Sequence, residues 1–331
     1  MSLILKQPLT GPEVWRGRDL ANDQSWAYHW SESDIASLDD ALQQFRTTGK
    51  HFPEFDRSHF RLHGLDDTLE SLADELENGR GFIYFKGLPI HRYSEDDINV
   101  IYYGLGLSLG LPVTQNPAGD LLGKVMNVGD LKDKNTRVYE TNAYLPYHTD
   151  PSDVFGLLCV RKAKAGGLNS LVSVASVYNR ILTMRPELLG LFYRPVYYAH
   201  LGENLPTLSP LFSYHKNKLT CRYLRQYIEL GHEVMKLPLS RVEIEALDLF
   251  DAIAHDEELR LDMMMEPGDM VFANNYMIMH SRTGFEEYDE PERRRKLLRL
   301  WLKMPNAREL APDFPGRNGF GVPAWLTDQV G

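Results

Sequence analysis

The sequence predicts a mainly β fold, in which the strands form a closed or two-sheet structure and helices pack outside it. From about residue 120 onward, short apolar segments recur between turn-forming residues. An open sheet of so many strands would leave unpaired edges, which favours closure or two facing sheets. No repeat, low-complexity tract or Pro/Ser-rich linker divides the chain, so we expect a single domain over residues 1–331.

The first part of this domain, residues 1–110, is predicted to be largely helical. Apolar side chains recur at helical spacing in three segments, which are residues 33–45, 67–78 and 95–109. Ser94 and Asp97 resemble a capping box at the start of the third helix, with Asp in place of the usual Glu or Gln. The apolar segment 81–87, bounded by glycines, predicts a short strand.

Residues 120–304 are predicted to form the β-rich core. The predicted strands are residues 123–128, 137–140, 154–160, 170–174, 196–199, 212–215, 219–223, 261–265, 270–273 and 297–302. Helical patterns interrupt them at residues 175–184, 186–192 and 240–255. Pro267-Gly268-Asp269 reads as a tight turn, and we interpret the apolar run from Met270 to His280 as one strand that follows it. The tail, residues 305–331, is rich in Pro and Gly and is predicted to be a surface strap.

The composition excludes several classes of function. Hydrophobic content of 43% and charged content of 25% are ordinary for a soluble globular protein. A net charge of −10 argues against nucleic acid as a partner, because phosphate binding needs a surplus of Lys and Arg. No segment approaches the roughly 20 apolar residues that a membrane helix needs, so no membrane is expected as a partner.

The cysteines indicate the cellular compartment. Cys159 and Cys221 are the only two, and both lie in apolar segments, so we expect buried free thiols rather than a disulfide framework. Residues 1–12 show no signal peptide. These observations predict a cytoplasmic protein. The sequence leaves the oligomeric state open, and a homo-oligomer is compatible with it.

His148 and Asp150 are the first indication of a metal site. Residues two apart on an extended strand share a face, so an imidazole and a carboxylate here would take neighbouring positions on one ion. A second imidazole would complete the 2-His-1-carboxylate arrangement of non-haem Fe(II) oxygenases. His280 is the candidate for it. The alternatives are a chance surface pair at 148 and 150 and a core histidine at 280.

A basic segment follows His280. Arg295 and Arg299 are four residues apart, which places both on one face of a strand. Arg299 lies within the apolar residues 297–302 and is therefore predicted to be buried. A buried guanidinium requires an anion, and a carboxylate suits its planar shape best. We interpret Arg293 and Arg294 as solvated.

Together with the Gly166-Gly167 and Pro267-Gly-Asp269 turns, these motifs resemble the Fe(II)/2-oxoglutarate dioxygenases of the taurine dioxygenase-like, clavaminate synthase-like group. The resemblance extends over about residues 15–305 and is strongest over 140–175 and 265–303. It implies a double-stranded β-helix, or jelly-roll, core with packed helices. The long insertion between His148 and His280 is typical of the group.

The resemblance also implies a role for each motif residue. His148, Asp150 and His280 would be the iron ligands and the catalytic centre, and Arg295 would pair with the distal carboxylate of 2-oxoglutarate. Ser170 matches a hydroxyl residue that helps to hold this carboxylate, but it is displaced by one position, so Asn169 is a rival. Arg299 matches a second arginine near the cosubstrate or an anionic substrate.

The implied cofactors are Fe(II), 2-oxoglutarate as cosubstrate and O2, and the products would include succinate and CO2. Because Asp150 fills the carboxylate position, hydroxylation, desaturation or cyclisation of a small molecule is expected rather than halogenation. An amino acid or a natural-product intermediate would be a suitable substrate. Two other classes of function stay open: a catalytically silent jelly-roll binding protein, and a zinc hydrolase at the same three residues.

The candidate substrate contacts are Asn142, Tyr147, Arg222 and Arg225, each with a structural role as the alternative. We interpret Arg222 and Arg225 as the basic end of a strand. If either faces the pocket, the substrate is expected to carry a carboxylate or another anion.

Overall fold

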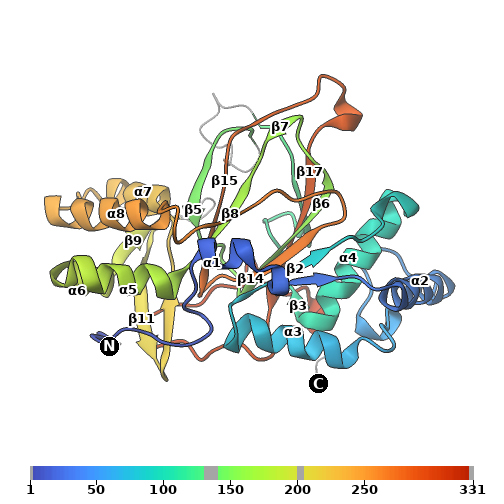
Figure 1. Cartoon of the computed structure of the whole chain (residues 1–331), viewed down its shortest axis with the longest axis horizontal. Coiled ribbons are helices and arrows are strands. Elements are labelled where there is room, and N and C mark those ends of the chain that lie inside the picture. The colour runs from blue at the N-terminus through green and yellow to red at the C-terminus, as the bar shows by residue number, and fades with distance from the viewer. Residues whose placement is uncertain (1–2, 130–140, 200–204, 328–331) are drawn as a thin grey trace.

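The computed structural model describes residues 3–129, 141–199 and 205–327. In this part of the chain, two β-sheets lie in the middle of the molecule and helices flank them on both sides (Figure 1). The fold is mixed α/β, and helices make up a larger part of it than the predicted mainly β fold implies. The predicted strand 137–140 lies outside the described residues.

The larger sheet has seven strands, and all of its pairings are antiparallel except that of β1 with β2. Its strand order is β1 (Ala27–His29), β2 (Phe82–Lys86), β14 (Met270–Asn274), β6 (Val154–Arg161), β17 (Lys296–Lys303) and β3 (Leu111–Pro112), and β4 (Leu122–Val125) also pairs with β17.

The smaller sheet has four antiparallel strands, in the order β13 (Leu261–Met263), β8 (Asn169–Ser173), β15 (Ile278–Arg282) and β5 (Leu145–His148). In this sheet His280 lies directly opposite His148. Three further antiparallel pairs complete the strands: β9 (Val196–Tyr198) with β10 (Thr207–Ser209), β11 (Phe212–His215) with β12 (Lys218–Cys221), and β7 (Ala165–Gly166) with β16 (Phe285–Glu286).

Apolar side chains from both sheets fill the space between them. Phe155 and Leu157 of β6 and Trp301 of β17 meet Leu171 of β8 and Ile278 of β15 in one buried cluster. The alternate residues of the same strands point outward, as the period of two requires. On the larger sheet they pack against α2 (Glu32–Thr47), α3 (Asp66–Asn78) and α4 (Glu95–Leu109). On the smaller sheet they pack against α5 (Val174–Met184), α6 (Leu189–Phe192) and α8 (Arg241–Ala254).

The helical predictions are confirmed to within a few residues. The helices expected at 33–45, 67–78, 95–109, 175–184 and 240–255 correspond to α2, α3, α4, α5 and α8. The Ser94–Asp97 capping box is present, with both of its hydrogen bonds. Cys159 and Cys221 are buried free thiols, as predicted. The short helices α1 (Gly17–Asn22) and α9 (Ala324–Thr327) were not predicted.

The run from Met270 to His280 is two strands and not one. It enters the larger sheet as β14, turns at residues 275–277 and leaves in the smaller sheet as β15. The turn is held by Asn274, whose side-chain oxygen accepts the Tyr276 N–H at 2.9 Å and whose amide donates to Glu77 at 2.9 Å. Periodicity missed the turn because every residue of the run is buried on one side or the other.

The basic strand end at residues 221–227 is also a correction. The strand ends at Cys221, and the helix α7 (Arg225–Met235) begins four residues later. One turn of α7 places Arg225 beside Glu229, and packing against α8 adds Asp248 and Asp251. These acidic partners favour the helical position of Arg225, and they cannot be seen in a short window of sequence.

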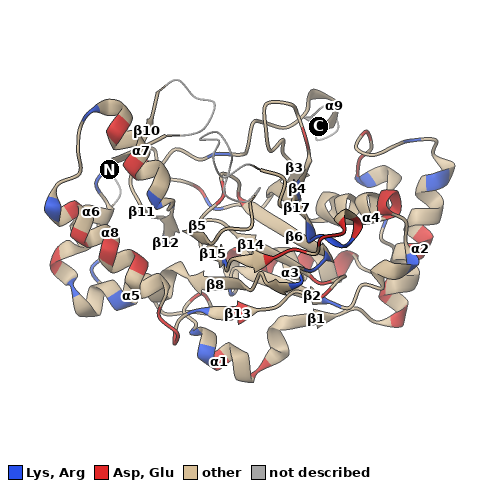
Figure 2. Cartoon of the chain, turned by 90° about the horizontal axis from the view of Figure 1, so that it is seen from above, with Lys and Arg blue, Asp and Glu red and all other residues tan. Residues whose placement is uncertain are grey.

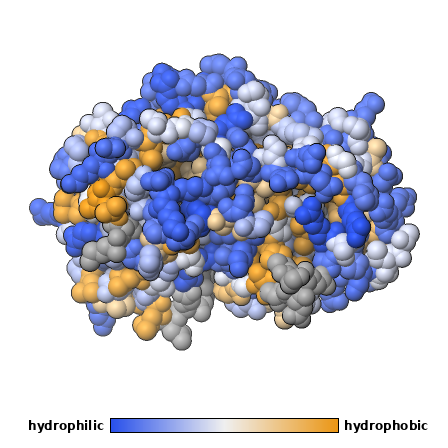
Figure 3. Space-filling model, turned by 90° about the horizontal axis from the view of Figure 1, so that it is seen from below, coloured by the Kyte–Doolittle hydropathy of each residue, from blue (hydrophilic) through white to orange (hydrophobic). Residues whose placement is uncertain are grey.

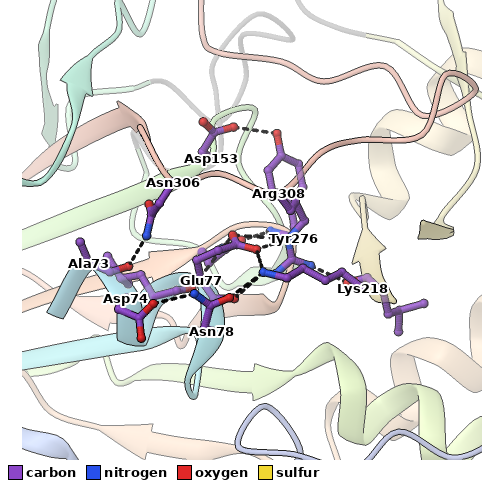
Figure 4. A network of polar contacts seen from close by, with 12 residues as sticks. Ala73, Asp74, Glu77, Asn78, Asp153, Lys218, Tyr276, Asn306 and Arg308 are labelled. Atoms are coloured by element: carbon purple, nitrogen blue, oxygen red, sulfur yellow. Dashed lines mark hydrogen bonds and ion pairs between the residues drawn. The ribbon is translucent and has the colours of Figure 1, made fainter. Parts of the chain in front are cut away.

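The C-terminal strap is fixed to the scaffold by a buried ionic network (Figure 4). Arg308 Nε donates to Glu77 at 3.1 Å, and Lys218 Nζ donates to the same carboxylate at 2.6 Å. Glu77 and Arg308 are both buried, so breaking this pair would leave an uncompensated charge, which typically costs about 3–5 kcal/mol. Residues 305–327 are therefore held firmly against the domain, and part of the strap, including Ala311 and Phe314, is buried rather than on the surface.

The outer surface is polar and mixed in charge. Basic and acidic residues are interspersed over the helices at both ends of the molecule (Figure 2). On the face seen in Figure 3, hydrophilic residues predominate and hydrophobic residues form small separate groups. Among the described residues, none of the helices has the length and apolar character needed to cross a bilayer.

Candidate active site

Three residues converge between the two sheets to form a cluster of metal-binding type. One donor atom from each of His148, Asp150 and His280 lies within 4.8 Å of the other two. The histidines meet because they are a cross-strand pair of β5 and β15, and such pairs bring side chains on one face together. Asp150 is not on the strand, which ends at His148; it lies in the loop that follows.

Each imidazole turns its Nε2 atom toward Asp150. The Nε2 atoms of His148 and His280 lie 3.9 Å from Oδ1 and Oδ2 of Asp150, respectively. Nδ1 of His148 is 2.8 Å from the carbonyl oxygen of Pro146, a bond that places the proton on Nδ1 and leaves the Nε2 lone pair for a ligand. The His280 ring stacks on Phe155 with the centroids 4.0 Å apart, which fixes its plane.

Asp150 is held by Asn275 of the turn at residues 275–277 and by two residues of β17. Its backbone N–H donates to the side chain of Asn275 at 2.9 Å, and Trp301 Nε1 donates to its Oδ2 at 2.9 Å. Arg299 approaches Oδ1 at 3.9 Å and is itself held by Gln115, which accepts from Arg299 Nε at 2.7 Å. The carboxylate therefore has a fixed orientation, as a metal ligand needs.

The protonation states also suit a metal. Burial would raise the pKa of Asp150, but the charge of Arg299 and the interactions with His280, His148 and Trp301 outweigh it, and the pKa lies below its usual value. Burial lowers the pKa of His148, and burial together with the neighbouring His148 lowers that of His280 well below normal. At neutral pH the cluster is one carboxylate and two neutral imidazoles, the forms that bind metal ions.

The cluster opens onto a cavity of about 340 Å³ that is lined mainly by apolar and aromatic side chains. Among the described residues that line it, Asp150 is the only carboxylate. Five arginines also line it, and they are Arg222, Arg282, Arg295, Arg299 and Arg317. In a chain with a net charge of −10, this cavity has a local surplus of positive charge. It is suited to anionic ligands.

Arg295 and Arg282 both line this cavity, and both are buried to 3% exposure. Their Cζ atoms lie 4.9 Å and 4.7 Å from the centroid of the Phe285 ring. Burial lowers the pKa of Arg295 to about 10, and burial together with the charge of Arg295 lowers the pKa of Arg282 to about 9. Gly167 lies next to Arg295 and has φ of +75°, a backbone conformation that favours glycine.

Strand alternation places Asn169 and Ser170 on opposite faces of β8. In β8, Asn169 is opposite Arg282 and lines the cavity, whereas the next residue, Ser170, is opposite Ser281 and points to the other face. The Ser170 hydroxyl donates to Asp262 of β13. This placement argues against Ser170 as a cosubstrate residue and favours Asn169.

Of the four candidate substrate residues, one lines the cavity and three do not. Arg222 lines the cavity, and its Nη2 donates to the carbonyl of Pro315 in the strap at 2.6 Å. Arg225 lies outside the cavity and is engaged by the acidic residues of α7 and α8. Tyr147 points away from His148 into the apolar cluster beneath α8, and Asn142 bonds the backbone of Phe285, so neither lines the cavity.

Sequence reasoning missed several residues of the site. Arg282 could have been found, because it is two residues after His280 in one strand, the spacing used to pair His148 with Asp150. Trp301 lies in the same strand as Arg299 and could have been found from its neighbours in the motif. Asn275, Gln115 and Arg317 come from distant segments, and no local pattern indicates them.

Comparison with known proteins agrees with this geometry. Residues 45–301 match the family described as taurine catabolism dioxygenase TauD, TfdA. FR-33289 synthase of Streptomyces rubellomurinus is 33% identical over 92% of this chain and 93% of its own length. The taurine hydroxylase-like protein SAT17 of Stachybotrys chartarum is 27% identical over 87% of this chain and 77% of its own. The chain therefore belongs to the TauD/TfdA dioxygenase family, and it is an Fe(II)/2-oxoglutarate-dependent dioxygenase.

Solved structures with the same fold include two amino-acid oxygenases. An asparagine oxygenase in complex with Fe(II), 3-hydroxyasparagine and succinate superimposes with a TM-score of 0.66 at 16% identity, over 84% of this chain and 93% of that one. The non-haem iron oxygenase OrfP in complex with Fe, succinate and (3S)-hydroxy-L-Arg superimposes with a TM-score of 0.64 at 12% identity, again over 84% and 93%. At these identities the likeness concerns the fold alone.

Proposed function

We propose that this enzyme hydroxylates a C–H bond of a small anionic molecule, with an amino-acid-like compound as the favoured class of substrate. The observation that carries the proposal is the cavity itself, because the His148–Asp150–His280 cluster opens onto a space whose other charged side chains are arginines. Such a cavity provides for two anions at once, the dicarboxylate cosubstrate and a negatively charged substrate.

The architecture supports a double-stranded β-helix core. Two largely antiparallel sheets face each other over residues 120–304, and the site lies between them. In this proposal residues 1–110 add the strands β1 and β2 and the helices that cover the larger sheet, and the short strand β3 follows directly after them. With the strap at 305–331, the whole chain forms a single catalytic domain.

The three clustered residues fit an iron ion. Two Nε2 atoms and a carboxylate supply nitrogen and oxygen ligands on one side, and the cavity leaves the other side accessible. In the proposal His148, Asp150 and His280 hold Fe(II). Together with 2-oxoglutarate and O2, the bound ion would supply the oxidising power for C–H cleavage. Trp301 and Asn275 keep Asp150 in position throughout.

The chain's own residues then orient the two organic ligands. Arg295 binds the distal carboxylate of 2-oxoglutarate, and Asn169 lies on the same wall of the cavity. Arg299 is engaged with Gln115 and Asp150, so we assign it to the support of the metal centre rather than to direct capture of substrate. The apolar residues Leu157, Leu297 and Val125 exclude water from this end of the cavity.

Arg222 and Arg317 define the substrate end. Arg222 comes from the segment after β12 and Arg317 from the strap, and both line the cavity with Tyr198 and Tyr227. Two guanidinium groups here favour a substrate with a carboxylate or another compact anion. The amino-acid products bound to the asparagine oxygenase and to OrfP support an amino-acid-like substrate of this size.

The two other classes of function account for the site less well. A binding protein would require neither three convergent metal ligands nor buried arginines beside them. A zinc hydrolase needs a general base, and among the described residues that line the cavity Asp150 is the only carboxylate, already committed to the cluster.

Anaerobic titration tests the proposed function directly. After reconstitution with Fe(II), addition of 2-oxoglutarate is expected to give a weak charge-transfer band at about 500 nm, as for a 2-oxoacid chelated at a 2-His-1-carboxylate iron site. Admission of O2 should then yield succinate. If iron is bound but 2-oxoglutarate produces neither a band nor succinate, the oxygenase proposal is wrong.

The anionic substrate has its own test. Among small amino acids, carboxylates and sulfonates, the compounds that stimulate succinate release are expected to carry a free carboxylate or sulfonate, and the amides or esters that lack this group should be inactive. For a stimulating compound, Arg222→Gln should raise KM by roughly 10- to 100-fold, the scale of a lost charge-assisted hydrogen bond. The KM for 2-oxoglutarate should be unchanged. Stimulation only by compounds without a carboxylate or sulfonate would contradict this assignment. An unchanged KM for the stimulating compound in Arg222→Gln would also contradict it.

A further inference from the structure

Arg282 is a buried cation that the described structure leaves partly unsatisfied. Its Nη2 donates to the carbonyl oxygens of Thr141, at 3.1 Å, and Ala143. Its Nε and Nη1 atoms are buried and have no hydrogen-bond partner among the residues that the structure describes. Buried polar groups are nearly always paired, and a buried guanidinium without an anion is costly. The side chain lines the cavity, so a ligand there can reach it.

Arg295 shows the same deficit beside it. Its Nη1 is buried without a partner among the described residues, and its guanidinium packs on the Phe285 ring, as that of Arg282 does. The carboxylate of Glu287 acts electrostatically on both guanidinium groups, and it accepts the backbone N–H of Arg295 at 2.9 Å. One carboxylate does not balance two guanidinium groups. The pair therefore requires a further negative charge from the cavity.

The position of Asn169 indicates that the negatively charged group required by the two arginines is a carboxylate of a bound ligand. Asn169 lies directly opposite Arg282 in the β8–β15 ladder and lines the cavity, so its amide can add a hydrogen bond to the same ligand. Guanidinium and amide N–H groups that line one cavity from neighbouring strands suit a planar anion with two oxygens better than a point charge. A neutral ligand would leave both guanidinium groups unpaired.

We propose that Arg282 is a second cosubstrate-binding residue, which forms with Arg295 a two-arginine cradle for the distal carboxylate of 2-oxoglutarate. This inference rests on the proposed function, because it takes 2-oxoglutarate as the cosubstrate. It adds a residue to the binding site and accounts for two buried cations packed on one aromatic ring. The alternative is a purely structural Arg282 that only holds the carbonyls of Thr141 and Ala143.

The two roles can be separated with a matched pair of 2-oxoacids. 2-Oxoglutarate and 2-oxopentanoate have the same five-carbon chain and the same chelating end, but only the first has a distal carboxylate. Binding to the Fe(II) protein is followed anaerobically by the charge-transfer band. In Arg282→Gln, the Kd for 2-oxoglutarate should rise by about 10- to 100-fold. The Kd for 2-oxopentanoate should stay within about twofold, since it makes no contact with the cradle.

Two further variants and one metal-free measurement complete the design. Arg282→Lys keeps the charge and should lose less affinity than Arg282→Gln, whereas Arg293→Gln, an exposed arginine, should bind both acids as the wild type does. Calorimetric titration of the metal-free proteins with glutarate should rank the variants in the same order. The wild type and Arg293→Gln should bind most tightly, Arg282→Lys less tightly and Arg282→Gln least tightly. Melting temperatures will identify any variant that fails to fold. If Arg282→Gln does not fold, Arg282→Lys is compared with the wild type instead.

Each outcome has a distinct meaning. If the wild-type protein binds neither 2-oxoacid, the proposed function fails, and this inference fails with it. If the wild type binds 2-oxoglutarate and the Arg282 variants bind it equally well, only the inference is overturned. A loss of equal size for both 2-oxoacids would also overturn it, because it would indicate a structural role.

Discussion

Asp150→Ala is expected to abolish succinate formation, with a loss on the order of 10³-fold or more, because it removes one of three proposed iron ligands. Loss of a partner that only orients a ligand typically costs about 10- to 100-fold. Trp301→Phe, which removes a hydrogen bond to Asp150 and no ligand, should therefore fall in that lower range. Coupled turnover of 2-oxoglutarate and the iron content of each variant are the measurements.

His255→Ala is the matched control for this experiment. His255 lies near the smaller sheet, with its ring centroid 5.1 Å from that of Tyr147, but it is not part of the cluster. It should retain iron and activity. Full activity in Asp150→Ala would remove Asp150 from the metal site, whereas lost activity in His255→Ala would show that general disturbance of this region suffices.

Arg295→Ala is expected to raise the KM for 2-oxoglutarate by roughly one to three orders of magnitude, the scale of a lost charge-assisted pair in a buried site. The guanidinium is buried and has a free N–H among the described residues, so its replacement removes binding energy that water cannot restore. The rate at saturating 2-oxoglutarate should change much less, because the iron ligands are untouched. Steady-state kinetics with the cosubstrate varied will give both values.

Arg299→Lys provides the contrasting case. Because Arg299 is engaged with Gln115 and lies 3.9 Å from Asp150, its replacement should lower iron affinity more than 2-oxoglutarate affinity. Wild-type dependence on 2-oxoglutarate in Arg295→Ala, together with a raised KM in Arg299→Lys, would transfer the cosubstrate role to Arg299.

Much of this arrangement could be predicted from the sequence because the relevant signals are local or pairwise. The helices have strong 3.6-residue periodicity, and the short spacing from His148 to Asp150 indicated a metal site although Asp150 proved to be off the strand. His280 and Arg295 were candidates from their context and spacing, and the resemblance implied their roles. The register could not be predicted. The difference of one position between Asn169 and Ser170 turns a side chain to the opposite face of β8, and only strand pairing decides it.

Other features depend on contacts between distant segments. The turn at 275–277 interrupts a continuous apolar run, and its hydrogen bonds go to Glu77 and to the loop of Asp150. Helix α7 begins directly after a segment that resembles the end of a strand, and its Arg225 is balanced by carboxylates from α8. A pattern read over a few residues has no access to partners of this kind.

The C-terminal strap contributes to the wall of the cavity but not to the His148–Asp150–His280 cluster. The family match stops at residue 301, yet Gly319 bonds the carbonyl of Pro151, next to Asp150, and Arg317 and Phe320 line the cavity. The His148–Asp150–His280 cluster thus lies within the matched region, while part of the cavity wall comes from a peptide beyond it. In our proposal, changes in this peptide would alter the substrate end of the cavity and leave the metal centre unaltered.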